Sequence, residues 1–147
     1  MSKTIILCHV VFGTKFRDPT ILPSRTHELY KYIYGLITIR KCKVIRINGI
    51  EDHVHILLDL HPSVALAELV RAVKQSSSNW IKEEGIFPKF EGWAVGYYAA
   101  SVSYGDKESC RQYIISQEEH HKHIGFREEM ESAIKSVGLV WYEDDWK

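Results

Sequence analysis

The 147-residue chain is 45% hydrophobic and 26% charged, a composition that excludes a disordered or low-complexity protein. Its length corresponds to one domain with a full hydrophobic core, so we expect residues 1–147 to form a single domain. The 19 Lys and Arg residues balance 19 Asp and Glu residues, and this zero net charge argues against strong non-specific binding to nucleic acid.

The charge is unevenly distributed along the chain. Residues 1–90 carry 13 Lys and Arg against 8 Asp and Glu, whereas residues 91–147 carry 6 against 11. A surface formed by the first part of the chain could therefore accept a polyanionic partner.

The three cysteines are scattered, without the spacing of a zinc ribbon or a redox pair. No apolar run is long enough to span a membrane, and the apolar residues 5–12 lead into a charged stretch without a cleavage site. We therefore expect a cytoplasmic protein with reduced thiols.

Hydrophobic periodicity divides the chain into strands and helices, because a spacing of two predicts a strand and a spacing of three or four a helix. The dipeptide Asn48-Gly49 predicts a tight turn between two strands. In chain order, the expected elements are a strand over 4–12, a helix capped by Ser24, strands over 43–47 and 52–60, a helix opening at Pro62-Ser63, a strand over 95–103, a helix from Gly105-Asp106 to about Ile124, and a short helix over 126–137.

This order predicts an α+β fold of the ferredoxin-like, split βαβ type (βαββαβ). Its antiparallel sheet carries two helices on one face, and a further C-terminal helix with a tyrosine is appended. The acidic tail 141–147, which contains tryptophan, is expected to dock on a partner or on the body of the domain.

His53 and His55 lie one pleat apart in the strand 52–60. Side chains alternate along a strand, so Val54 and Ile56 should pack under the two helices while both imidazoles emerge on the open face. Two imidazoles so placed can bind one metal ion, and the appended helix is the natural element to cover them.

Tyr113 and Gln117 lie one turn apart on that appended helix. A tyrosine hydroxyl is a usable nucleophile when its proton is removed and a metal ion polarises its target. A glutamine amide oxygen could complete the ion's ligands beside His53 and His55.

The chain resembles the single-tyrosine HUH transposases of the IS200/IS605 type and their domesticated REP-associated relatives. The resemblance rests on four stretches in the family's order and spacing, which are 12–17 (FGTKFR), 52–57 (DHVHIL), the helix 66–80 with Lys74, and 113–121 (YIISQEEHH).

The resemblance implies an enzyme, a transposase that cleaves and rejoins single-stranded DNA through a covalent 5′-phosphotyrosine link. By this analogy Tyr113 is the nucleophile, and His53, His55 and Gln117 hold a divalent ion, Mg²⁺ or Mn²⁺. No nucleotide cofactor is needed, because the link preserves the phosphodiester energy. The partners implied are hairpin-forming single-stranded DNA and a second copy of the chain in a homodimer; the tyrosine helix then acts either within one subunit or across two.

Basic residues of the first part of the chain could follow the phosphates of such a DNA. The candidates are Lys15, Arg17, Arg46, Arg71 and Lys74. For Arg71 and Lys74 the alternative is an ordinary solvated helix face.

Other interpretations of these residues stay open. The two strand histidines could be surface or core residues without a ligand, and Tyr113 could be a packed helix tyrosine. The run 118–123 (EEHHKH) is expected to be a solvated helix end, although His120 or His121 could assist proton transfer, and His9 is expected to be structural.

Two alternative functions also remain. One is a domesticated or inactive relative that binds structured single-stranded nucleic acid without cleavage. The other is a metal-dependent hydrolase in which the two strand histidines bind zinc and water is the nucleophile.

Overall fold

A computed structural model describes residues 2–147 of the chain. Its helices and strands, in chain order, are β1 (Leu7–Gly13), α1 (Thr26–Thr38), β2 (Lys43–Ile50), β3 (His53–Asp59), α2 (Leu66–Glu84), β4 (Tyr98–Val102), α3 (Lys107–Ile115), α4 (Gln117–His120) and α5 (Phe126–Ser136).

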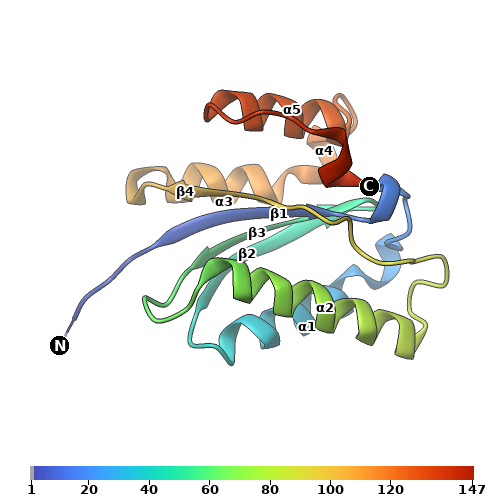
Figure 1. Cartoon of the computed structure of the whole chain (residues 1–147), viewed down its shortest axis with the longest axis horizontal. Coiled ribbons are helices and arrows are strands. Elements are labelled where there is room, and N and C mark those ends of the chain that lie inside the picture. The colour runs from blue at the N-terminus through green and yellow to red at the C-terminus, as the bar shows by residue number, and fades with distance from the viewer. Residues whose placement is uncertain (1) are drawn as a thin grey trace.

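The four strands form one antiparallel sheet in the order β2-β3-β1-β4. Helices α1 and α2 lie on one face of the sheet, while α3, α4 and α5 lie on the other (Figure 1). The predicted ferredoxin-like α+β fold is therefore confirmed, including the helices appended after β4.

Two hydrophobic clusters stabilise the two faces. The larger one joins α1 and α2 to the sheet and contains Val10, Phe12, Val54 and Ile56. The smaller one lies on the opposite face, beneath α5, and its buried members are Val11, Tyr98, Phe126, Met130, Ile134 and Trp146. Alternate residues of β1 thus serve alternate clusters, as the pleat requires.

The C-terminal tail docks on the body of the domain, one of the two outcomes expected for it. Trp146 is buried, packs against Phe126 and stacks on Trp141 with ring centroids 5.7 Å apart. The backbone carbonyl of Asp145 accepts a hydrogen bond of 2.7 Å from the Gly96 amide. A Cβ atom added to Gly96 would lie 2.8 Å from that carbonyl oxygen, so glycine permits this close approach.

The turn predicted at Asn48-Gly49 is wrong. Both residues continue β2 and pair with His55 and Val54, and the chain reverses at residues 51–52. A Cβ atom on Gly49 would lie 2.1 Å from the carbonyl oxygen of His53, so glycine serves a close approach of two strands. The Asn48 amide donates to the carbonyls at the end of α3, a use that a turn signal does not reveal.

The helix predicted to run to about Ile124 is also shorter than expected, because it breaks at Ser116 and resumes as α4. The Ser116 hydroxyl donates 3.0 Å back to the Gln112 carbonyl, a bond that tends to bend helices. The Asn48 amide occupies the carbonyls of Ile114 and Ile115, with N···O distances of 3.0 and 3.1 Å. The break therefore has two local causes, and it still leaves Gln117 beside Tyr113.

Within residues 2–147, the structure contains no helix that combines the length and the apolar character needed to cross a membrane.

Candidate active site and metal centre

His53 and His55 project from β3 onto the sheet face that α3, α4 and α5 cover. Both are fully buried, and the intervening Val54 packs in the opposite, larger cluster. The strand alternation therefore places the imidazoles as expected, and the covering helices remove them from water.

The Nδ1 nitrogens of His53 and His55 both have hydrogen-bond partners. His53 Nδ1 lies 2.7 Å from the Asp52 carboxylate, and His55 Nδ1 lies 2.8 Å from His9 Nε2. Such bonds orient an imidazole so that its other nitrogen, Nε2, points into the site. His9 has the structural role expected for it, whereas the contribution of Asp52 was not anticipated.

Tyr113 and Gln117 approach the same imidazoles from above the sheet. The Tyr113 ring lies edge-on to His55 with centroids 5.7 Å apart, and the buried Gln117 Oε1 lies 3.1 Å from His53 Nε2. The hydrogen bonds from Asn48 to the end of α3 hold this helix against β2. The four predicted site residues are therefore brought together within one chain.

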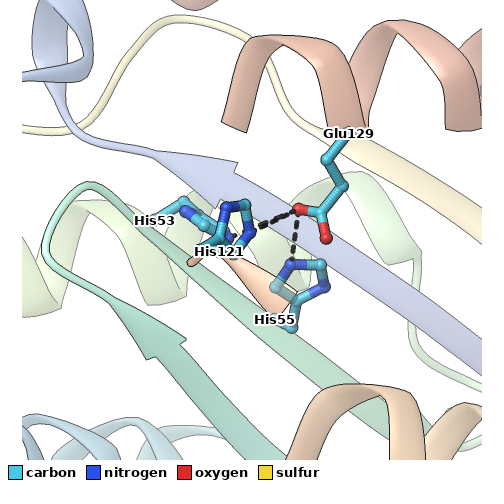
Figure 2. Close-up of side chains that lie close together, drawn as sticks. All are labelled: His53, His55, His121 and Glu129. Atoms are coloured by element: carbon cyan, nitrogen blue, oxygen red, sulfur yellow. Dashed lines mark hydrogen bonds and ion pairs between the residues drawn. The ribbon is translucent and has the colours of Figure 1, made fainter. Parts of the chain in front are cut away.

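The carboxylate of Glu129, a residue of α5, faces the imidazoles of His53, His55 and His121 (Figure 2). Glu129 was not identified from the sequence. Its Oε1 lies 3.5 Å from His53 Nε2, 3.2 Å from His55 Nε2 and 3.1 Å from His121 Nε2. Its Oε2 accepts hydrogen bonds from the Tyr113 hydroxyl and, at 3.3 Å, from the Gln117 amide.

A sequence signal for Glu129 existed. Phe126, Met130 and Ile134 follow one another at helical spacing and form the buried face of α5. Glu129 falls on that same face, three residues after Phe126, and is 4% exposed. A charged residue on the apolar face of a helix indicates a partnered, functional group rather than a solvated one.

The run 118–123 is not the uniformly solvated helix end that was expected. The side chain of His121 is 4% exposed and points into the site, and His120 Nε2 lies 3.1 Å from Glu129 Oε2. Glu119, Lys122 and His123 do remain largely exposed. The segment 118–123 thus divides into histidines that face the site and residues that remain solvated.

Burial and hydrogen bonding set the protonation states of the site. Burial lowers the pKa of His55 to about 3, against the opposing effect of its hydrogen bond with Glu129. Burial alone would raise the pKa of Glu129, but hydrogen bonds from His121, His53 and His55 outweigh it and hold that pKa well below its usual range. Glu129 is therefore an ionised carboxylate in a buried site.

The pKa of Tyr113 is shifted in the opposite direction to that of Glu129. Burial, together with the hydrogen bond to Glu129 and the negative charge of that carboxylate, raises the pKa of Tyr113 above its ordinary value. The hydroxyl therefore keeps its proton at rest and donates a hydrogen bond to the Glu129 carboxylate.

The donor set fits a divalent cation. One ligand atom from each of His53, His55, His121 and Glu129 lies within 4.8 Å of the others. Three imidazole nitrogens and a carboxylate oxygen at this spacing form a cluster that can hold a metal ion, and the imidazoles of His53 and His55 are oriented by further hydrogen bonds at Nδ1.

The predicted DNA-binding residues come from several elements, Lys15 and Arg17 from the segment after β1, Arg46 from β2, and Arg71 and Lys74 from α2. Arg17 forms an ion pair with Glu143 at 3.2 Å, and Arg46 and Arg71 are exposed on β2 and α2. Lys74 differs from the others because its ammonium group donates to three successive carbonyls, those of residues 94–96, at 2.6, 2.9 and 3.2 Å. It anchors the loop before β4 to α2, which was not foreseen for it.

The sequence comparisons all match this chain to transposases. A family profile described as "Transposase IS200 like" matches residues 2–117. The transposase of insertion sequence element IS200 from Salmonella typhimurium is 24% identical over 119 residues, which cover 78% of each protein. The ISDra2 transposase TnpA of Deinococcus radiodurans is 25% identical over 114 residues, covering 74% of this chain and 81% of that protein.

Two solved structures share the fold. A crystal structure from Deinococcus radiodurans R1, assigned as a transposase, superposes with a TM-score of 0.63 at 21% identity and covers 79% of this chain and 93% of its own. A REP-associated tyrosine transposase, solved bound to a REP hairpin, superposes with a TM-score of 0.63 at 14% identity and covers 100% of this chain and 90% of its own.

Proposed function

This chain belongs to the IS200-like transposase family, a family of DNA-cleaving and rejoining enzymes, and on that premise we propose that it acts on single-stranded DNA through a covalent 5′-phosphotyrosine link on Tyr113. The observation that carries the proposal is the meeting of the Tyr113 hydroxyl, a buried ionised carboxylate and two strand imidazoles at one point of a single chain.

Glu129 is the proton acceptor for the attack. The Tyr113 hydroxyl donates to Glu129 Oε2, so the phenolic proton passes to this carboxylate as the tyrosine oxygen forms its bond to phosphorus. The bond from phosphorus to the 3′ oxygen breaks at the same centre, and that oxygen leaves and takes up a proton as a 3′ hydroxyl. Rejoining reverses the step, because a 3′ hydroxyl attacks the phosphotyrosine and Tyr113 recovers its proton.

His53, His55 and Gln117 are the proposed ligands of a divalent cation, Mg²⁺ or Mn²⁺. When bound, this ion would polarise the scissile phosphate and stabilise the charge that develops on it. Asp52 and His9 hold the two imidazoles in the orientation that exposes Nε2. Both imidazoles and Gln117 are 0% exposed, whereas Tyr113 is half-buried.

The proposed substrate is single-stranded DNA with a hairpin, the kind of ligand named for the REP-associated relative of the same fold. We expect the protein to act as a homodimer, as the family resemblance implies. Tyr113 meets the histidines of its own chain, so we expect the tyrosine to act in cis within each subunit.

Incubation with labelled hairpin DNA and Mn²⁺ tests this function. Wild-type protein should form a covalent adduct that survives denaturation, and Tyr113→Phe should abolish it. Tyr104→Phe is the matched control, because Tyr104 is 70% exposed and loses the same hydroxyl group.

Two other experimental outcomes would each support an alternative function. Cleavage that persists in Tyr113→Phe would refute the tyrosine mechanism and favour hydrolysis by water. Tight hairpin binding by the wild-type protein without any adduct would indicate a domesticated relative that binds without cutting.

A further inference from the structure

His121 and Glu129 enter the site from a part of the chain that follows the family match, which ends at residue 117. We propose that these two side chains are additional ligands of the metal ion, so that His121 Nε2 and Glu129 Oε1 join His53, His55 and Gln117. The proposal rests on the proposed function, because it concerns the ion of the same site.

The first support is geometric. Oε1 of Glu129 lies 3.5, 3.2 and 3.1 Å from the Nε2 atoms of His53, His55 and His121. Adjacent ligand atoms at about 2.0–2.1 Å from an ion in octahedral geometry stand about 2.8–3.0 Å from one another. The three separations in the structure are slightly longer, and all four atoms lie within 4.8 Å of one another, so they are close enough to share one divalent ion.

The second support comes from counting hydrogen atoms on His53. Its Nδ1 lies 2.7 Å from the Asp52 carboxylate, which only accepts, so Nδ1 carries the hydrogen of the neutral ring. Nε2 faces two oxygen atoms, Gln117 Oε1 at 3.1 Å and Glu129 Oε1 at 3.5 Å. It donates to them when the ring is protonated, and a metal ion that displaces this proton meets three lone pairs. A cation between these atoms turns three opposed lone pairs into three ligands.

A purely hydrogen-bonded arrangement is the alternative. His53 Nε2 can donate to Gln117 Oε1 at 3.1 Å, which leaves the two lone pairs of Glu129 Oε1 for His55 and His121. Mn²⁺ binding distinguishes this arrangement from coordination, because only coordination makes the Mn²⁺ affinity depend on His121 and Glu129.

The second carboxylate oxygen of Glu129, Oε2, is hydrogen-bonded to Tyr113 and Gln117. Oε2 accepts from the Tyr113 hydroxyl and from the Gln117 amide, while Oε1 faces the imidazoles. One carboxylate thus links the ion to the nucleophile, and the loss of Glu129 removes both a ligand and the proton acceptor of Tyr113.

The completed donor set also predicts which ion binds. Three imidazole nitrogens suit first-row transition ions, whereas Mg²⁺ prefers oxygen ligands and retains several waters. We therefore expect Mn²⁺ to bind the full-length protein at least tenfold more tightly than Mg²⁺. A set limited to two imidazoles and an amide would discriminate less.

Calorimetric titration of the chelator-treated, full-length protein with Mn²⁺ alone tests the two ligands. Glu129→Gln and His121→Ala should each weaken Mn²⁺ binding at least tenfold relative to the wild-type protein. Two matched controls are available: Glu128→Gln changes the exposed neighbour on α5, and His123→Ala changes a histidine whose side chain is 79% exposed. Both controls should bind as the wild type does.

Pulsed electron paramagnetic resonance of bound Mn²⁺ gives an independent measurement, because it counts directly coordinated imidazole nitrogens. His121→Ala should remove one nitrogen from the wild-type count. Circular dichroism of each variant establishes that the fold is retained. An affinity loss below tenfold in Glu129→Gln and His121→Ala would overturn the proposal, and tighter binding by Glu129→Gln would identify its carboxylate as a plug that competes with the ion.

The two proposals fail separately. If the function is right and the extra ligands are wrong, the wild type forms a Tyr113-dependent adduct while Glu129→Gln keeps its Mn²⁺ affinity. If the ligands are right and the function is wrong, the affinities fall as expected while the wild type forms no adduct.

Discussion

Removing the Phe126 ring should detach α5 from the sheet and withdraw Glu129 from the site. Phe126 is the first residue of α5 and is 4% exposed. Its ring stacks on His53 with centroids 4.2 Å apart and meets Trp146 at 5.5 Å. It therefore joins three elements, namely β3, α5 and the C-terminal tail.

The expected magnitude follows from this packing. Truncation of a buried phenylalanine to alanine costs about 3–5 kcal/mol, and we expect about 3 kcal/mol because the cluster around Phe126 is small. For a protein of this length, each kcal/mol lowers the melting temperature by about 2–4 °C, so Phe126→Ala should lower it by about 6–12 °C. The first amides to exchange faster should be those of α5, because this helix depends on the smaller cluster.

Thermal unfolding by circular dichroism and hydrogen exchange by mass spectrometry measure the two effects. Phe16→Ala is the matched control, since the Phe16 ring is 55% exposed and its loss should change stability by less than about 0.5 kcal/mol. If Phe126→Ala has the same melting temperature as Phe16→Ala and the amides of α5 exchange no faster than in the wild type, the reasoning about this cluster is refuted.

Three further predictions concern single groups. Lys74→Met should lower the free energy of unfolding in urea by about 1–3 kcal/mol, because three carbonyls lose their donor. Arg71→Met, one turn away and exposed, should change it by less than about 0.5 kcal/mol, and equal losses would contradict the anchoring role of Lys74. In the metal-free protein, Glu129→Gln should lower the pKa of Tyr113, since a neighbouring negative charge raises it; ¹³C NMR of labelled tyrosine measures this, and an unchanged or higher pKa counts against the assignment. A mixture of Tyr113→Phe and His53→Ala proteins should form no adduct if the tyrosine acts in cis, whereas restored adduct would show that the helix is exchanged between subunits.

The fold followed from local patterns wherever one periodicity dominated. The alternation around His53 and His55 predicted which side chains enter the larger core, and the helix over residues 126–137 was predicted to within one residue of α5. Predictions were wrong where a residue interacts with a partner that is far away in the sequence. Asn48-Gly49 has the composition of a turn, but here Asn48 binds the end of α3 and Gly49 admits the neighbouring strand.

The sequence by itself determined the outline of the site. Strand alternation placed His53 and His55 on one face, and helical spacing placed Tyr113 beside Gln117, because such short-range relations depend on backbone geometry alone. Spacing of this kind fixes the local geometry, so Tyr113 and the two imidazoles could be proposed as site residues before any contact was known.

Only the tertiary structure decided what completes the site. Glu129 lies 74 residues from His55, and His121 lies 68 residues from His53, yet their ligand atoms come within 4.8 Å of one another. The packing of α5 through Phe126 and Met130 brings Glu129 there, and burial then makes its charge depend on the surrounding imidazoles. Spacing along the chain contains no information about such an approach, because it results from the docking of a whole helix on the sheet.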